Sequence, residues 1–98
     1  MSGTSLTNIL YVEDDLDIQA VAQIALEVVG GYTLKTCSSG AEALAAIDGG
    51  FVPDLLLLDV MMPNMDGPTT LAELRKKTTT ASTPVIFMTA KVQSSEQD

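Results

Sequence analysis

The sequence feature that most constrains the fold is a run of four leucines, Leu55–Leu58, followed directly by Asp59. Because the run does not alternate between apolar and polar residues, it predicts a β-strand covered on both faces, as in the centre of a parallel sheet. Ligands of open α/β sheets bind beyond the carboxyl ends of the strands, so a carboxylate at this position indicates chemistry. A plainer interpretation is that Asp59 only caps the turn before Pro63, since aspartate is a common turn residue.

Strands and helices are predicted to alternate along the chain. Short apolar and β-branched runs predict three further strands, at residues 8–12, 32–37 and 84–89. Apolar residues at helical spacing predict helices between the strands, over residues 15–29, 39–48 and 68–77. Parallel neighbours need crossover connections, so this alternation predicts an α/β fold, a doubly wound parallel sheet with helices on both faces.

Two of the predicted helices carry more specific signals. The second begins at Ser39, with Glu42 at the spacing of a capping box. Asp15 is placed to cap the first helix. That first helix has one apolar stripe, typical of a helix that packs on one side, formed by Ile18, Val21, Ala22, Ala25, Val28 and Val29.

Length and charge limit the classes of function. Ninety-eight residues suit one small domain, which we expect at residues 8–98 after a disordered lead-in at 1–7. Thirteen acidic residues against five basic ones give a net charge of −8. This charge argues against phosphate contacts with nucleic acid and favours cations or basic protein surfaces as partners.

The cellular setting is also indicated by composition. The chain has no apolar run near the roughly 20 residues that span a bilayer, and its first eight residues lack the regions of a signal peptide. The single cysteine, Cys37, is expected to be a small buried side chain rather than a redox group. These features predict a cytoplasmic domain with no membrane partner.

Polar residues follow three of the predicted strands. Glu13 and Asp14 follow the first strand, Asp59 ends the third, and Thr89 ends the fourth. Because parallel strands end at one edge of the sheet, these groups can converge, and clustered carboxylates persist when a cation neutralises them. Oxygen ligands without histidine or cysteine select a hard ion, Mg²⁺ first. The alternative is that the acidic cluster only caps the first helix.

A carboxylate beside a metal, with a hydroxyl opposite, suits phosphoryl transfer. Asp59 can act as the nucleophile and form an acyl phosphate, while Mg²⁺ neutralises the charge on the phosphoryl oxygens. A phosphatase of the haloacid dehalogenase type also uses an aspartate at a strand end. That type needs a second aspartate two residues further on, where this chain has Met61.

Three motifs in order resemble the receiver domain of bacterial two-component response regulators, the CheY-like fold. They are Val12-Glu13-Asp14-Asp15, the segment from Leu58 to Gly67, and the segment from Pro84 to Ala90. The resemblance covers nearly the whole chain from Asn8 and implies the strand order 2-1-3-4. It also implies a phosphorelay signalling domain that is not an enzyme with ordinary turnover, but catalyses its own phosphoryl transfer and dephosphorylation.

The resemblance assigns the centre of the site. Asp59 would be the phosphoacceptor, taking a phosphoryl group from the phosphohistidine of a histidine kinase or a histidine phosphotransfer protein. Glu13, Asp14 and Asp59 would hold Mg²⁺ together with the backbone carbonyl of Met61.

The resemblance also assigns the rim of the site. Thr89 would bind the phosphoryl oxygens and shift when they arrive, with help from the Ala90 amide. Met61 and Lys91 would influence dephosphorylation, and Pro63 and Gly67 would shape the loop that presents Asp59.

One departure from the family leaves an alternative open. The family carries a Lys-Pro pair at the end of a fifth strand, then a fifth helix, and this sequence has neither; Lys91 does not substitute for that lysine. We therefore expect the fourth strand to be an open edge, in a chain that is either C-terminally incomplete or completed by association, as a homodimer or with another chain. The alternative function is a receiver-like interaction or dimerisation module that accepts no phosphate. The resemblance itself implies a domain that changes conformation on phosphorylation and regulates a partner or an output domain.

Overall fold

The computed structural model describes residues 7–62 and 64–88. Within them, strands and helices alternate as the sequence predicts, with two short helical segments of other types added. In chain order the elements are β1 (Asn8–Val12), α1 (Leu16–Gln23), the π-helix η1 (Ile24–Val29), β2 (Thr33–Cys37), α2 (Gly40–Asp48), β3 (Leu55–Asp59), α3 (Gly67–Arg75), the 3₁₀ helix η2 (Thr78–Thr80) and β4 (Val85–Met88).

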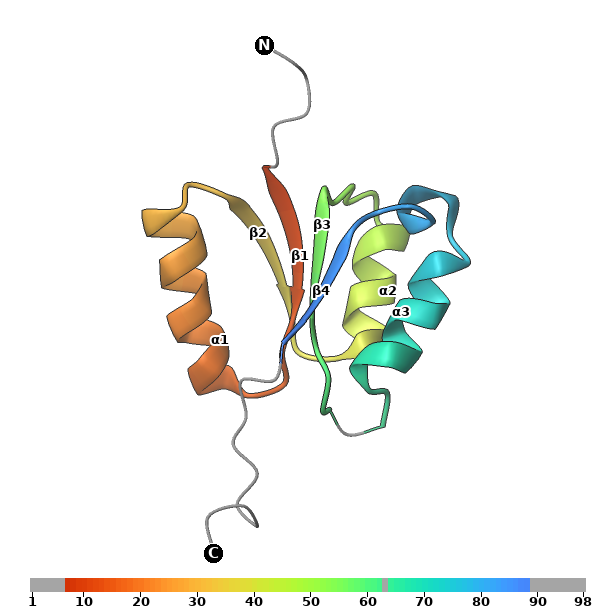
Figure 1. Ribbon diagram of the computed structural model, residues 1–98, viewed down its shortest axis with the longest axis horizontal. Helices are drawn as coiled ribbons and strands as arrows, with labels where there is room; N and C mark the ends of the chain where they lie inside the picture. Colours follow the sequence, from red (N-terminus) through yellow and green to blue (C-terminus); the bar gives the residue numbers. More distant parts are fainter. Residues whose placement is uncertain (1–6, 63, 89–98) are drawn as a thin grey trace, which may run out of the picture.

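The four strands form one parallel sheet in the order β2-β1-β3-β4. α1 lies on one face of this sheet, and α2 and α3 lie on the other (Figure 1). The predicted doubly wound α/β fold and its strand order are therefore confirmed. β2 lies at one edge, which explains its weaker burial, and β4 lies at the other edge of the described sheet.

The hydrophobic core lies between the sheet and the α2–α3 layer. Leu10 and Val12 of β1 and Leu56 and Leu58 of β3 are fully buried there. They form one cluster with buried side chains of both helices, Ala43, Ile47 and Leu74. This face is well covered because β1 and β3, the two central strands, each direct alternate apolar side chains toward it.

The opposite face is less covered than the sequence predicts. The four-leucine run was expected to be buried on both faces, but Leu55 and Leu57 are only partly buried, whereas Leu56 and Leu58 are buried. On the neighbouring β4, Ile86 pairs in register with Leu57 and is 52% exposed. α1 and its continuation η1 are the described helices on this face (Figure 1), and Ile86 stays exposed beside them.

The predicted apolar stripe of the first helix is only half used for packing. Ile18 and Ala22 are partly buried, but Val21 and Val28 are 70% and 76% exposed. The last six residues of this helical segment, η1, are π-helical, and the Gly30 amide donates to the Ala25 carbonyl at 3.0 Å. The prediction of one buried stripe is thus wrong for its second half, because no described element packs against that side.

Side-chain caps begin each α-helix. Asp15 caps α1 by accepting from the Asp17 and Ile18 amides, and Ser39 caps α2 by accepting from the Glu42 amide. Asp66 caps α3 by accepting from the Thr69 amide at 2.8 Å, which lowers the pKa of the Asp66 carboxyl. The caps predicted at Asp15 and Ser39 are therefore present.

Asp54 connects the amino ends of β1 and β3. Its carboxylate accepts from the Asn8 amide at 2.9 Å and from the Thr7 amide at 3.1 Å, and these bonds lower its pKa. Thr7, expected in the disordered lead-in, is thus hydrogen-bonded; residues 1–6 of that lead-in lie outside the described residues. None of the described helices is long and apolar enough to cross a membrane.

Candidate functional site: an acidic pocket at the sheet edge

The site is built where β1 and β3 end side by side. The two strands are neighbours in register, with Val12 opposite Leu58, so the residues that follow Val12 come close to Asp59. Glu13 is held in place by its amide, which donates to the Cys37 carbonyl of β2 at 3.0 Å. The strand order therefore brings together side chains that are distant in sequence.

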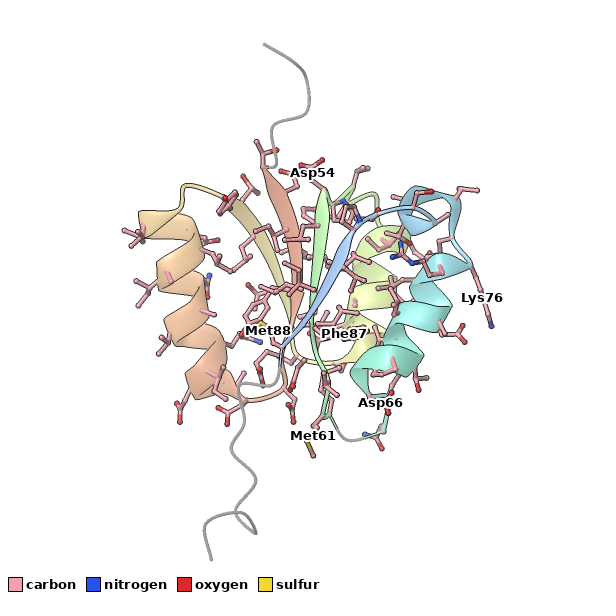
Figure 2. The ribbon with its side chains drawn as sticks, in the orientation of Figure 1. Asp54, Met61, Asp66, Lys76, Phe87 and Met88 are labelled. Carbon is pink, nitrogen blue, oxygen red and sulfur yellow. The ribbon has the colours of Figure 1, made fainter. Side chains whose placement is uncertain are left out.

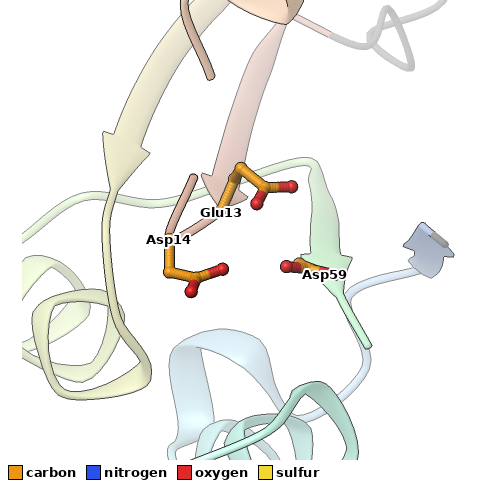
Figure 3. A group of neighbouring side chains, drawn as sticks. All are labelled: Glu13, Asp14 and Asp59. Carbon is orange, nitrogen blue, oxygen red and sulfur yellow. The ribbon is translucent and has the colours of Figure 1, made fainter. Parts of the chain in front are cut away.

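Three carboxylates meet at this edge. One oxygen each of Glu13, Asp14 and Asp59 can be chosen so that all three lie within 4.8 Å of one another. Glu13 and Asp59 are 0% and 1% exposed, whereas Asp14 is partly exposed. The Asp14 and Asp59 carboxylates point toward each other across the gap between the two strand ends (Figure 3).

Backbone amides orient two of the carboxylates. The Asp15 amide donates to Glu13 Oε2 at 3.0 Å, and the Met61 amide donates to Asp59 Oδ1 at 3.2 Å. Met61 therefore lies next to the Asp59 carboxylate, and the residue is 50% exposed. Its carbonyl as a metal ligand stays a prediction.

The three side chains fit a hard divalent cation. They supply only oxygen donors, as Mg²⁺ prefers, and two of them are removed from water. Carboxylates this close repel one another, and a cation between them would offset that repulsion. An acidic cluster that only caps a helix would instead face solvent. Asp15 performs that capping role for α1 here.

The two ends of the loop after Asp59 are joined by a backbone hydrogen bond. The Gly67 amide donates to the Val60 carbonyl at 3.1 Å, and Asn64 adopts a left-handed conformation with φ of 70°. A Cβ at Gly67 would lie 2.5 Å from the Asp59 carbonyl oxygen. Glycine is therefore required by the close approach of α3 to Asp59. The loop-shaping role of Gly67 stays a prediction.

Four residues that were predicted for the rim of the site cannot be placed. Pro63, Thr89, Ala90 and Lys91 lie outside the described residues, so their roles remain predictions.

Gln19 is a site neighbour that the sequence reasoning missed. Its side-chain amide donates to the Glu13 carbonyl at 2.9 Å, next to the acidic cluster. No pattern in the sequence pointed to this role, because it depends on which carbonyls lie near Gln19 once α1 has packed on the sheet.

Cys37 and the opposite edge of the sheet are not part of this site. Cys37 is buried, and this burial, with a smaller contribution from the Glu42 carboxylate, raises the pKa of its thiol to about 11, which suits the predicted packing role.

Asp54 lies at the edge opposite to Met61 and Asp66 (Figure 2). There it lines a shallow hollow of about 290 Å³ together with Pro53, Thr78, Thr79, Ser82, Thr83 and Pro84.

Fold and site together define a class of protein: a doubly wound α/β domain with an acidic pocket at the carboxyl edge of its sheet. Residues 9–97 match the response regulator receiver domain family. The chain therefore belongs to that family, and the predicted resemblance is confirmed.

Individual relatives agree with this assignment. The chain is 41% identical over 86 residues to the transcriptional regulatory protein CpxR of Klebsiella pneumoniae, an alignment that covers 88% of this chain and 34% of the relative. The chain thus spans about a third of the length of that relative. A response regulator receiver domain from Methanoculleus marisnigri is 42% identical with a TM-score of 0.78, and the match covers 94% of this chain and 73% of that one.

A third similar protein was solved with a metal. The receiver domain of the sensor histidine kinase PA1611 from Pseudomonas aeruginosa, with a magnesium ion coordinated in the active site cleft, is 26% identical with a TM-score of 0.78. The match covers 96% of this chain and 76% of that one.

Proposed function

We propose that this chain is a phosphoacceptor domain of a two-component phosphorelay and that Asp59 receives the phosphoryl group. The observation that carries the proposal is the position of Asp59, which is buried at the strand end and within 4.8 Å of two further carboxylates. Membership of the receiver family and the magnesium-bound relative support it. The donor is the phosphohistidine of a histidine kinase or a histidine phosphotransfer protein.

In the proposed reaction an Asp59 oxygen attacks the phosphorus of the donor. The new bond joins that oxygen to phosphorus, and the phosphorus–nitrogen bond breaks, with its electron pair and a proton going to the imidazole. The Met61 amide donates to Oδ1 of Asp59 at 3.2 Å and so helps to orient the carboxylate for this attack. Water later attacks the acyl phosphate and restores the carboxylate, so the domain acts as a switch without ordinary turnover.

Glu13 and Asp14 complete the proposed site. Together with Asp59 they would hold Mg²⁺, which supplies neutralisation of the charge on the transferring group. Phosphorylation adds charge at the edge of the sheet, and the surface around that edge is what a partner would read. The free, buried Cys37 fits a reducing, cytoplasmic setting, which is part of the proposal.

The test combines metal binding with phosphorylation. Thermal unfolding is measured with Mg²⁺ alone and with beryllofluoride, which imitates the acyl phosphate, and intact mass is measured after incubation with acetyl phosphate. We expect stabilisation by the ligands and the mass gain of one phosphoryl group. Asp59→Asn should abolish the mass gain, whereas Asp48→Asn, an exposed acid in an ion pair with Lys77, should leave it unchanged. A mass gain that persists in Asp59→Asn would refute the assignment.

A second candidate function is an interaction or dimerisation module that takes no phosphate. It is favoured by the apolar side chains exposed on η1 and on β4, such as Val28 and Ile86. Sedimentation of the unphosphorylated chain tests it. Self-association without any phosphoryl uptake would favour this candidate over the phosphoacceptor.

A further inference from the structure

Gln19 donates hydrogen bonds to three acceptors on two segments next to the acidic cluster. It lies in α1 and is partly buried. Its Nε2 donates to the Glu13 carbonyl at 2.9 Å, and at 3.4 Å to both the Cys37 carbonyl and Ser38 Oγ. One side chain therefore joins the first helix to the residue after β1 and to the end of β2.

The hydrogen bond from Gln19 to the Glu13 carbonyl holds the peptide unit that joins two residues of the acidic cluster. The Glu13 carbonyl belongs to the peptide unit that links Glu13 to Asp14, the two carboxylates contributed by this turn. On the other side of Glu13, its amide donates to the Cys37 carbonyl at 3.0 Å. The backbone around Glu13 is thus held from both sides, once by β2 and once by Gln19.

We propose that Gln19 is a positioning residue for the acidic site. By holding the Glu13–Asp14 peptide, its amide sets the direction in which both carboxylates leave the backbone and so keeps their oxygens close to Asp59. The inference rests on the proposed function, because it assigns Gln19 a role in cation binding by Glu13, Asp14 and Asp59. In other proteins, groups that hydrogen-bond to metal ligands without touching the metal orient those ligands and contribute strongly to metal affinity.

The chemistry of the contacts requires an amide at this position. Two of the three acceptors are backbone carbonyls, which need a donor, and the carboxylate of a Gln19→Glu variant could not donate to them. Leucine in a Gln19→Leu variant has a similar size and no donor. The same helix provides a matched control, since Gln23 lies one turn further on, is exposed, and donates to Glu27 Oε1 at 3.3 Å.

The experiment measures the Mg²⁺ dissociation constant by calorimetry at a temperature where each variant is fully folded. We expect Gln19→Leu to raise this constant about tenfold and Gln23→Leu to leave it unchanged. The metal-free proteins are compared by urea unfolding and by the hydrogen-exchange rate of the Asp14 amide. A positioning role predicts faster exchange at Asp14 together with weaker metal binding, whereas a merely structural role would lower unfolding stability and leave the Mg²⁺ constant unchanged.

The outcomes separate this inference from the proposed function. If the wild-type chain binds Mg²⁺ and takes the phosphoryl group, while Gln19→Leu binds Mg²⁺ equally well, the positioning role is overturned and the proposed function stands. If the wild-type chain binds no Mg²⁺, both are overturned. Should Gln19→Leu not fold, Gln19→Met, unbranched like glutamine and without a donor, is measured in its place with the same expected result.

Discussion

At the residue scale, Gly67 occupies a position that leaves no room for a side chain. α3 begins so close to the end of β3 that a Cβ here would lie 2.5 Å from the Asp59 carbonyl oxygen and 3.1 Å from Val60 Cα. Both neighbours are backbone atoms, which cannot rotate away as a side chain can. The glycine therefore controls how near the helix approaches the proposed phosphoacceptor.

We expect Gly67→Ala to lower the free energy of unfolding by about 1–3 kcal/mol, since the backbone near Asp59 must shift to admit the methyl group. It should also weaken Mg²⁺ binding. Urea unfolding and calorimetry check both effects. Gly49→Ala is the control, because Gly49 ends α2 in an ordinary right-handed conformation, and it should change stability little. Equal effects of the two variants would contradict the close-approach argument.

Cys37 gives a prediction for pH dependence. Its thiol pKa is raised from 9.0 to about 11, so the folded state holds the proton more tightly than the unfolded state. The protonated Cys37 thiol therefore makes its full contribution to the free energy of unfolding below pH 9. This contribution is lost as the pH rises through about 11. At pH 8, alkylation of the native thiol should be about 100-fold slower than in urea. In Cys37→Ala, unfolding stability should fall less between pH 8 and 11; an equal fall would contradict this assignment.

At the element scale, α2 depends on its cap as much as on its apolar face. The Ser39 hydroxyl accepts from the Glu42 amide at 3.1 Å, and Glu42 Oε1 accepts from the Ser38 amide at 2.8 Å. The predicted capping box is thus present with its return bond shifted by one residue. These bonds fix the start of a short helix that supplies Ala43 and Ile47 to the core.

Ser39→Ala should destabilise the domain by about 1 kcal/mol, because the Glu42 amide loses its acceptor in the first turn. Ser82→Ala serves as the control, since Ser82 is exposed and lies outside the helices and strands. Chemical denaturation of both variants measures the difference. A loss in Ser82→Ala as large as that in Ser39→Ala would show that the cap is not responsible.

At the scale of the whole molecule, the described part of the chain has one closed face and one open side. The core between the sheet and the α2–α3 layer is fully buried, while α1 and β4 leave large apolar side chains in contact with water. Ile86 and Phe87, 52% and 39% exposed, are consecutive strand residues and therefore point to opposite faces of β4. This is the edge at which the sequence predicted an open strand.

Such a surface should bind the dye anilinonaphthalene sulfonate, which fluoresces on exposed apolar patches. We expect Ile86→Lys to reduce the fluorescence clearly. Val52→Lys replaces an equally exposed apolar residue in the loop before β3 and should reduce it little. Circular dichroism of both variants verifies that the fold is kept. Equal fluorescence of wild type and Ile86→Lys would show that β4 does not form the patch.

Sequence reasoning predicted the elements well and their burial less well. The leucine run identified β3, but periodicity shows which residues are apolar and not which partner covers them. The partial burial of Leu57 and the exposure of Val28 were therefore missed. The acidic residues were found because they follow strands. Gln19 was not, since its role depends on which carbonyls lie near it once α1 has packed on the sheet.

The amino-acid sequence by itself determined the order of strands and helices, the helix caps at Asp15 and Ser39, and the strand-end position of Asp59, because these depend on residues close together in the chain. Only the tertiary structure decided that Glu13 and Asp14 lie within 4.8 Å of Asp59 and that Gln19 donates to the peptide that links Glu13 to Asp14. It also decided that one side of the sheet is open in the described part of the chain. The physical reason is that these features arise from the pairing of β1 with β3 and from the packing of α1, which join segments far apart in sequence.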